Sequence, residues 1–261
     1  MKITVFNGSM RGAKSITHLI ADEFLRGAQS AGATVDNVFL VKKKIAHCRG
    51  CLTCWIKAPG QCVHHDDMAP LLEKFLDSDI VVMASPVYID NVTGLMKDFM
   101  DRLIPVTDPH FEPDGSGETR HVKKHAKYPG IFVISTCGFP EQSAFQVLRL
   151  LFPRIARSLN AEYLGGIYRS GGGFLAVEEP ALAPIIDEYK ELVRTAGAEI
   201  AETMKLSERT VEKLEQQLIP TEPYNAQVNA IWDHLMTKAR ENRAKNETPA
   251  AASGPGTDGP R

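Results

Sequence analysis

Short apolar segments alternate with amphipathic segments of helical period along most of this chain, and no other feature constrains its fold as strongly. Strands that alternate with helices form a parallel sheet that is covered on both faces. We therefore predict an α/β fold with a doubly wound, five-stranded parallel sheet. The predicted strands are residues 3–6, 35–41, 79–84, 130–135 and 162–168, and the predicted helices are residues 15–31, 68–76, 94–104, 143–159 and 180–204.

The segments that follow this unit have a different pattern. Residues 207–243 carry two helical patterns separated by Pro220 and Pro223, and the last residues lack an apolar period and are rich in Gly, Pro and Ala. Segments of that composition do not bury enough apolar surface to fold. We predict an α/β domain over residues 1–205, a C-terminal helical appendage over 206–244 and a disordered tail over 245–261.

Charge and hydropathy exclude several classes of protein. The 30 Lys and Arg residues nearly balance the 32 Asp and Glu residues, which gives a net charge of −2 and no support for nucleic-acid binding. No apolar run approaches the roughly 18–20 residues of a membrane span. The chain enters its first apolar segment after one lysine, without the apolar core of a signal peptide. We expect a cytoplasmic protein with neither a nucleic-acid nor a membrane partner.

The loop after the first predicted strand is rich in small and hydroxyl residues. It reads Asn7-Gly8-Ser9-Met10-Arg11-Gly12-Ala13-Lys14-Ser15-Ile16-Thr17. Backbone N–H groups at the start of a helix bind anions such as phosphate, and the hydroxyl groups and Arg11 add donors. The loop matches neither a Walker A motif nor a dinucleotide fingerprint. An ordinary turn with a Ser or Thr N-cap would use the same residues, so both interpretations stay open here.

Two further loops follow predicted strands. The first contains Ser85-Pro86-Val87-Tyr88-Ile89-Asp90-Asn91, and the second contains Ser135-Thr136-Cys137-Gly138. An aromatic residue beside a proline suits a flat ring, and glycine lets the backbone approach a ligand closely. A surface loop with Tyr88 packed on its neighbours is the alternative. The segment after the fifth predicted strand, Arg169-Ser170-Gly171-Gly172-Gly173-Phe174, has more glycine than a tight turn needs.

Together, these loops resemble those of the flavodoxin-like NAD(P)H-dependent FMN reductases. The first loop is close to the family signature N-G-S-x-R-x-x-S-x-T, with one extra residue between Arg11 and Ser15. The S-P-V-Y loop and the K-x-x-x-D-R segment of the family are present at residues 85–88 and 97–102. The resemblance covers residues 1–205. It implies a flavodoxin-like sheet with FMN at its carboxyl edge and NAD(P)H as co-substrate.

The resemblance also implies which residues contact FMN. No catalytic side chain is named, because the cofactor carries the chemistry and the protein positions it. Flavins in this family lie near subunit contacts, so we expect a homo-oligomer, either a dimer or a tetramer. The implied phosphate contacts are Ser9, Arg11, Ser15 and Thr17, and the implied ring contacts are Pro86, Val87, Tyr88 and Asn91 on one side and Thr136, Cys137 and Gly138 on the other.

Four cysteines form the pattern C-x2-C-x2-C-x7-C at Cys48, Cys51, Cys54 and Cys62. Thiolates that lie so close in sequence can surround a soft metal or a cluster. The pattern resembles the compact motif of the iron–sulfur flavoproteins, a branch of the same fold with a [4Fe-4S] cluster beside FMN. We take the cluster as the leading interpretation. A loop without a cluster, a structural zinc site and a redox disulfide are the alternatives.

Two other segments have interpretations of their own. Residues 106–128 are too long for an ordinary connector, and their His, Lys and Arg residues predict either a functional loop over the flavin or a solvated loop that packs an oligomer. Asp66 and Asp67 are expected to cap the helix that starts at Met68, rather than to join His64 and His65 in a metal site.

The favoured function is an FMN-dependent oxidoreductase that passes electrons from NAD(P)H to a small-molecule or redox-protein acceptor. The sequence does not distinguish NADH from NADPH and does not identify the acceptor. A non-enzymatic electron carrier, flavodoxin-like or ferredoxin-like, is the alternative from another class. A flavin-free regulatory or structural member of the family is a third possibility.

Overall fold

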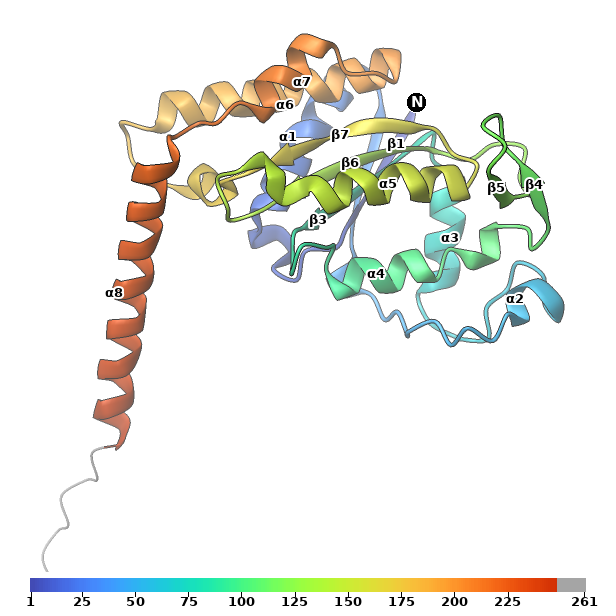
Figure 1. Cartoon of the computed structure of the whole chain (residues 1–261), viewed down its shortest axis with the longest axis horizontal. Helices are drawn as coiled ribbons and strands as arrows, with labels where there is room; N and C mark the ends of the chain where they lie inside the picture. The colour runs from blue at the N-terminus through green and yellow to red at the C-terminus, as the bar shows by residue number, and fades with distance from the viewer. Residues whose placement is uncertain (248–261) are drawn as a thin grey trace, which may run out of the picture. The chain divides into compact units, whose positions relative to one another are not determined.

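A five-stranded parallel sheet forms the centre of the computed structural model, which describes residues 1–247 (Figure 1). The strand order is β2-β1-β3-β6-β7, and every neighbouring pair is parallel. The predicted doubly wound α/β fold is thereby confirmed. The strands are β1 (Lys2–Asn7), β2 (Thr34–Phe39), β3 (Ile80–Pro86), β6 (Gly130–Thr136) and β7 (Tyr163–Arg169).

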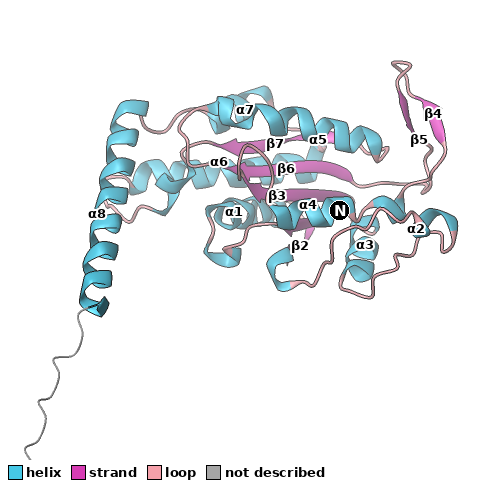
Figure 2. Cartoon of the chain, turned by 60° about the horizontal axis from the view of Figure 1, so that its bottom comes forward, coloured by secondary structure: helices cyan, strands magenta, loops and turns pink. Residues whose placement is uncertain are grey.

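Helices cover both faces of the sheet, as the buried character of its central strands requires (Figure 2). On one face Phe24 of α1 stacks on Phe132 of β6, with ring centroids 4.9 Å apart. On the other face Phe6 of β1 stacks on Phe99 of α4 at 4.4 Å. The covering helices are α1 (Ile16–Ser30) and α6 (Ala183–Thr203) on the first face and α3 (Met68–Leu76), α4 (Gly94–Asp101) and α5 (Gln146–Ser158) on the second.

The strand order reverses between β1 and β3, because the chain adds β2 on one side of β1 and the later strands on the other. In open α/β sheets ligands bind in the crevice outside the carboxyl ends of the strands at such a switch point. The fold therefore directs attention to the loops after β1, β3 and β6.

The helix α7 (Glu208–Glu215) lies within the first compact unit of the structure, Met1–Leu218, and not in the predicted appendage that starts at residue 206. The buried guanidinium of Arg169 holds it there by donating to the backbone oxygens of Leu214 and Gln216 at 3.3 and 3.0 Å. A cation at the C-terminus of a helix is favourable. The second unit, residues 219–261, contains α8 (Thr221–Glu247), and most of the predicted tail lies outside the described residues.

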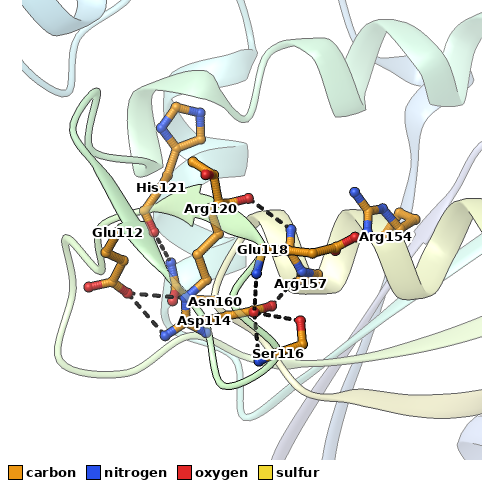
Figure 3. A network of polar contacts seen from close by, with 10 residues as sticks. Glu112, Asp114, Ser116, Glu118, Arg120, His121, Arg154, Arg157 and Asn160 are labelled. Carbon is orange, nitrogen blue, oxygen red and sulfur yellow. Dashed lines mark hydrogen bonds and ion pairs between the residues drawn. The ribbon is translucent and has the colours of Figure 1, made fainter.

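Residues 106–128, for which either a functional or a solvated loop was predicted, contain a β-hairpin in which β4 (Phe111–Pro113) pairs with β5 (Thr119–His121). Figure 3 shows the polar contacts that hold this hairpin to α5. Arg157 donates to a carboxylate oxygen of Asp114 at 2.6 Å and to the Thr119 backbone oxygen at 3.1 Å. Asn160 donates to the backbone oxygen of His121 at 2.7 Å. The hairpin is thus fixed on the end of α5.

Among the described residues, no helix combines the length and the apolar character that crossing a membrane demands.

Candidate functional site

The loops that follow β1, β3, β6 and β7 converge on one open pocket of about 240 Å³. Ten of the eleven residues for which cofactor contacts were predicted line it, and Asn91 is the exception. Ile16, Gly172 and Gly173 also line the pocket and were not predicted. The predicted residues in the lining are Ser9, Arg11, Ser15, Thr17, Pro86, Val87, Tyr88, Thr136, Cys137 and Gly138.

The first loop is shaped by its own side chains. Asn7 Oδ1 accepts a hydrogen bond from the Ser9 N–H at 3.0 Å, which turns the chain at the end of β1. Ser15 Oγ accepts from the His18 N–H at 3.0 Å and donates to the Gly12 backbone oxygen at 2.8 Å. Ser15 is therefore the N-cap of α1. Because the pocket lies at this N-terminus, the two interpretations of the loop, cap and anion site, are compatible.

A tight turn explains why Asn91 does not line the pocket. The backbones of Tyr88 and Asn91 exchange hydrogen bonds of 2.8 and 3.1 Å, and the two residues between them, Ile89 and Asp90, have positive φ. Asn91 Oδ1 accepts from the Val92 N–H at 2.8 Å, so its side chain stabilises the turn. The same turn presents Tyr88, which is 46% exposed, at the pocket.

The third loop carries the buried Cys137. Burial raises the pKa of the Cys137 thiol, and its Sγ donates to the Phe139 backbone oxygen at 3.3 Å. This buried cysteine is a packing residue of the loop. The loop is joined to the glycine-rich segment after β7, where the Gly172 N–H donates to the Cys137 backbone oxygen at 2.9 Å. The run of three glycines at residues 171–173 was the sequence feature that could have predicted Gly172 and Gly173 as pocket residues.

The four clustered cysteines lie in the segment between β2 and α3, around the short helix α2 (Thr53–Ile56). All are free thiols, with Cys54 buried, Cys51 exposed and the others half-buried. Burial raises the pKa of Cys54, and the neighbouring thiols of Cys62, Cys48 and Cys51 raise it further. In residues 1–247, however, no three His, Cys, Asp or Glu side chains are arranged to hold a metal ion.

A buried ion pair anchors this cysteine segment to the end of α4. Arg102, which is 1% exposed, donates to both carboxylate oxygens of Asp66 at 2.8 and 3.0 Å and to the Ala46 backbone oxygen at 2.8 Å. Burial alone would raise the pKa of Asp66, but hydrogen bonds from Arg102 and from the N–H groups of Ala46 and Met68 outweigh it and lower the pKa to about 2. Asp66 thus contacts the start of α3, as predicted, and its main partner is Arg102.

The helix α4 separates the pocket from the cysteine segment. Its N-cap, Thr93, donates to the Gly8 backbone oxygen at 2.7 Å beside the pocket, and Arg102 at its other end binds Asp66. At 1.5 Å per residue, the helix is on the order of 12 Å long. None of the four clustered cysteines lines the pocket, and their segment contacts α4 at Asp98, through His47, and at Arg102, through Asp66.

A match to the model of a known protein family shows which family this chain belongs to. Residues 1–152 match the model of the NADPH-dependent FMN reductases. The chain belongs to this family. The first loop and the S-P-V-Y loop, which carried the resemblance, both lie within the matched residues.

Several curated relatives of this family member are named iron–sulfur flavoproteins. One from Archaeoglobus fulgidus is 37% identical over 152 residues, which cover 58% of this chain and 62% of the relative. One from Methanosarcina thermophila is 32% identical over 111 residues, which cover 42% of this chain and 56% of the relative. The chain thus spans about half to three fifths of the length of these relatives.

Solved structures of similar fold include flavin-dependent enzymes. An FMN-dependent NADH-azoreductase from Bacillus anthracis, solved in complex with FMN, superposes with a TM-score of 0.57 at 16% sequence identity. The superposition covers 77% of this chain and 99% of the azoreductase chain. An NAD(P)H:quinone oxidoreductase from Methanothermobacter marburgensis superposes with a TM-score of 0.53 at 13% sequence identity. The superposition covers 76% of this chain and 95% of the oxidoreductase chain. These likenesses support the flavodoxin-like fold of the reductase family.

Proposed function

We propose that this chain is an FMN-dependent oxidoreductase that passes electrons from NAD(P)H to a small-molecule or redox-protein acceptor. The observation that carries the proposal is the convergence of three loops, predicted from separate parts of the sequence, on one pocket at the switch point of the sheet. When bound, FMN supplies the chemistry: it takes up two electrons as a hydride and releases them singly or together.

The residues of the chain bind and orient the cofactor in this proposal. The N–H groups at the start of α1, the Ser9 hydroxyl and the Arg11 guanidinium would hold the phosphate. Pro86 and Tyr88, which line the pocket, would flank one side of the ring, and the backbone at Cys137 would lie on the other side. No side chain of the chain is assigned a proton-transfer role in this proposal.

We expect NADPH or NADH to bleach the flavin of the FMN-loaded protein within seconds of anaerobic mixing. The proposed function requires electron entry from a pyridine nucleotide, and a stopped-flow spectrophotometer measures it as a loss of the oxidised-flavin band. The absence of bleaching with both nucleotides would support the non-enzymatic carrier. A preparation that takes up no FMN would support the flavin-free alternative.

A pair of neighbouring variants tests the phosphate site in the same assay. Arg11→Ala is expected to raise the Kd for FMN about tenfold, because it removes one charge-assisted hydrogen bond to phosphate. Met10→Ala is the matched control, since Met10 is exposed in the same loop and does not line the pocket. Equal affinities of the two variants would place the phosphate elsewhere.

We also propose that Cys48, Cys51, Cys54 and Cys62 hold a [4Fe-4S] cluster, which supplies single-electron transfer when bound. Four soft, free thiols within residues 48–62 fit such a cluster by the chemistry of the donors. The names of the curated relatives support the same assignment. Because no three of these side chains are arranged as ligands in the described residues, ligation needs the segment to rearrange around the buried Cys54.

Protein purified without oxygen is expected to contain iron and acid-labile sulfide in equal amounts, with a broad brown absorption beneath the flavin bands. Cys54→Ser should remove both and leave the flavin bands in place. Cys137→Ser is the matched control, because Cys137 lies outside the cysteine segment. Zinc without sulfide would establish the structural metal site instead, and absence of both after reconstitution would establish a loop without a cluster.

A further inference from the structure

Two buried threonine hydroxyls meet in the wall of the proposed cofactor pocket. Thr17 lies in the first turn of α1 and Thr136 is the last residue of β6, and both line the pocket. Their Oγ1 atoms are 2.8 Å apart, although the two residues are 119 positions apart in the sequence. Thr17 is 1% exposed and Thr136 is 5% exposed. This hydrogen bond therefore joins the proposed phosphate end of the pocket to the loop at its proposed ring end.

The pair has one hydroxyl proton that the protein does not use. Each threonine hydroxyl can donate one hydrogen bond, and a bond between two hydroxyls takes up one of the two protons. Within residues 1–247, neither Oγ1 atom has another hydrogen-bond partner. A buried donor without a partner costs free energy unless a ligand accepts from it. The remaining proton is thus available to a molecule in the pocket.

The chemistry of phosphate decides the direction of the bond between the two threonines. In the proposed function, FMN places its phosphate at the start of α1, and ionised phosphate oxygens only accept hydrogen bonds. Thr17 would therefore use its own proton for the phosphate. Thr136 must then donate to Thr17, and the Thr136 Oγ1 atom keeps only lone pairs for the ring side of the pocket.

Thr136 also fixes the orientation of the Thr17 side chain. A threonine in a helix has two common χ1 rotamers, in one of which its hydroxyl bonds a backbone oxygen of the preceding turn. In the structure, the Thr17 hydroxyl contacts Thr136 instead. Thr136 is itself held on the sheet, where its backbone oxygen accepts from the Val87 N–H at 2.8 Å. The end of β6 is thus a rigid support for a hydroxyl group on α1.

We infer that Thr136 is a positioning residue for the phosphate of FMN and acts through the hydroxyl of Thr17. The inference rests on the proposed function, because it takes FMN as the ligand of the pocket. It adds a role to the one that the resemblance implied for Thr136, which is a contact with the ring. Removal of the Thr136 hydroxyl should therefore weaken the binding of a phosphate from which Thr17 separates it.

Comparison of FMN with riboflavin, which lacks the phosphate, tests this inference. Thr17→Val should lower the ratio of FMN affinity to riboflavin affinity about tenfold, because valine keeps the shape of threonine but removes the donor. Thr136→Val should lower the same ratio about threefold or more. The double variant should lower it no further than Thr17→Val, since the two hydroxyls act in series. Titration of flavin fluorescence with the full-length protein measures both affinities.

Thr4→Val is the matched control, and Thr136→Ser tests for rescue. Ser78 donates to Thr4 Oγ1 at 2.8 Å in an equally buried hydroxyl pair that does not line the pocket. The affinity ratio should keep its wild-type value in Thr4→Val and return toward that value in Thr136→Ser, which retains the hydroxyl.

Two kinds of result would overturn the inference, and they differ from failure of the proposed function. The first is a wild-type ratio in Thr136→Val, and the second is a double variant in which the two single losses add. Wild-type protein that binds neither flavin would overturn the proposed function and the inference with it. Equal affinities of wild type for FMN and riboflavin would overturn the inference alone, because the pocket would then bind a flavin without holding its phosphate.

Discussion

Replacing Arg102 with methionine is expected to lower the free energy of unfolding by about 3–5 kcal/mol. Methionine fills a similar volume but leaves the carboxylate of Asp66, whose side chain is 10% exposed, without its ion-pair partner. The Ala46 backbone oxygen loses its donor as well. Because Asp66 lies between the cysteine segment and α3, the segment should also become more mobile. Urea unfolding measures the loss, and protection of the segment from hydrogen exchange measures the mobility.

Lys97→Met is the matched control for this prediction. Lys97 lies on the same helix and pairs with Asp101 at 2.6 Å, but both side chains are about half exposed. An exposed i,i+4 pair contributes roughly 0.3–0.5 kcal/mol, so the control should lose less than about 1 kcal/mol. Similar losses in the two variants would show that Arg102 contributes no more than a surface cation.

The dependence of the free energy of unfolding on pH gives a second test of the role of Arg102. The pKa of Asp66 is about 2 in the folded protein, against the ordinary value of 3.8. A carboxyl with a lowered pKa contributes stability above its unfolded pKa, and the contribution is lost as pH falls from about 4 through about 2. For wild type this loss is on the order of 2 kcal/mol. The Arg102→Met variant should lose less over the same interval, because its Asp66 titrates closer to the ordinary value.

The parts of the fold that follow from local pattern were predictable, and the cofactor pocket was predictable in outline. The strands β1, β3 and β6 are largely apolar runs, and the alternation of strand and helix patterns located β2 and β7 as well. The pocket followed from the loops after these strands, because parallel strands carry such loops to one edge. Asn91 shows the limit: its side chain is used by the turn that it helps to form, and a loop sequence does not reveal which hydrogen bond a side chain makes.

Contacts between distant residues were beyond prediction. Arg102 was visible within a family motif, but nothing in the sequence marked Asp66, 36 residues away, as its partner. The strands β4 and β5 are three residues each and largely polar, so they show no alternation; Arg157 and Asn160 of a later segment hold them. The helix α7 was predicted, but its place in the first unit depends on a buried guanidinium from β7.

Substituting alanine for Gly27 is expected to lower the free energy of unfolding by about 3 kcal/mol or more, although alanine is the better helix former. The helices α1 and α6 cross with their backbones in contact. A Cβ atom on Gly27 would lie 1.9 Å from the Arg194 backbone oxygen, and one on Gly197 would lie 2.0 Å from the Phe24 backbone oxygen. Backbone atoms cannot rotate away, so the two helices must separate. Thermal unfolding of Gly27→Ala and Gly197→Ala measures the cost.

Gly94→Ala separates this effect from the general effect of adding a methyl group to a helix. A Cβ atom on Gly94, at the start of α4, meets nothing within 4 Å, so this variant should be neutral or more stable by up to about 1 kcal/mol. Since the proposed phosphate site lies at the N-terminus of α1, displacement of α1 in Gly27→Ala should also weaken FMN binding, whereas Gly94→Ala keeps α1 in place. If Gly27→Ala is as stable as wild type, the glycine contact between α1 and α6 does not contribute to stability. If it also binds FMN with wild-type affinity, the contact does not position the proposed phosphate site.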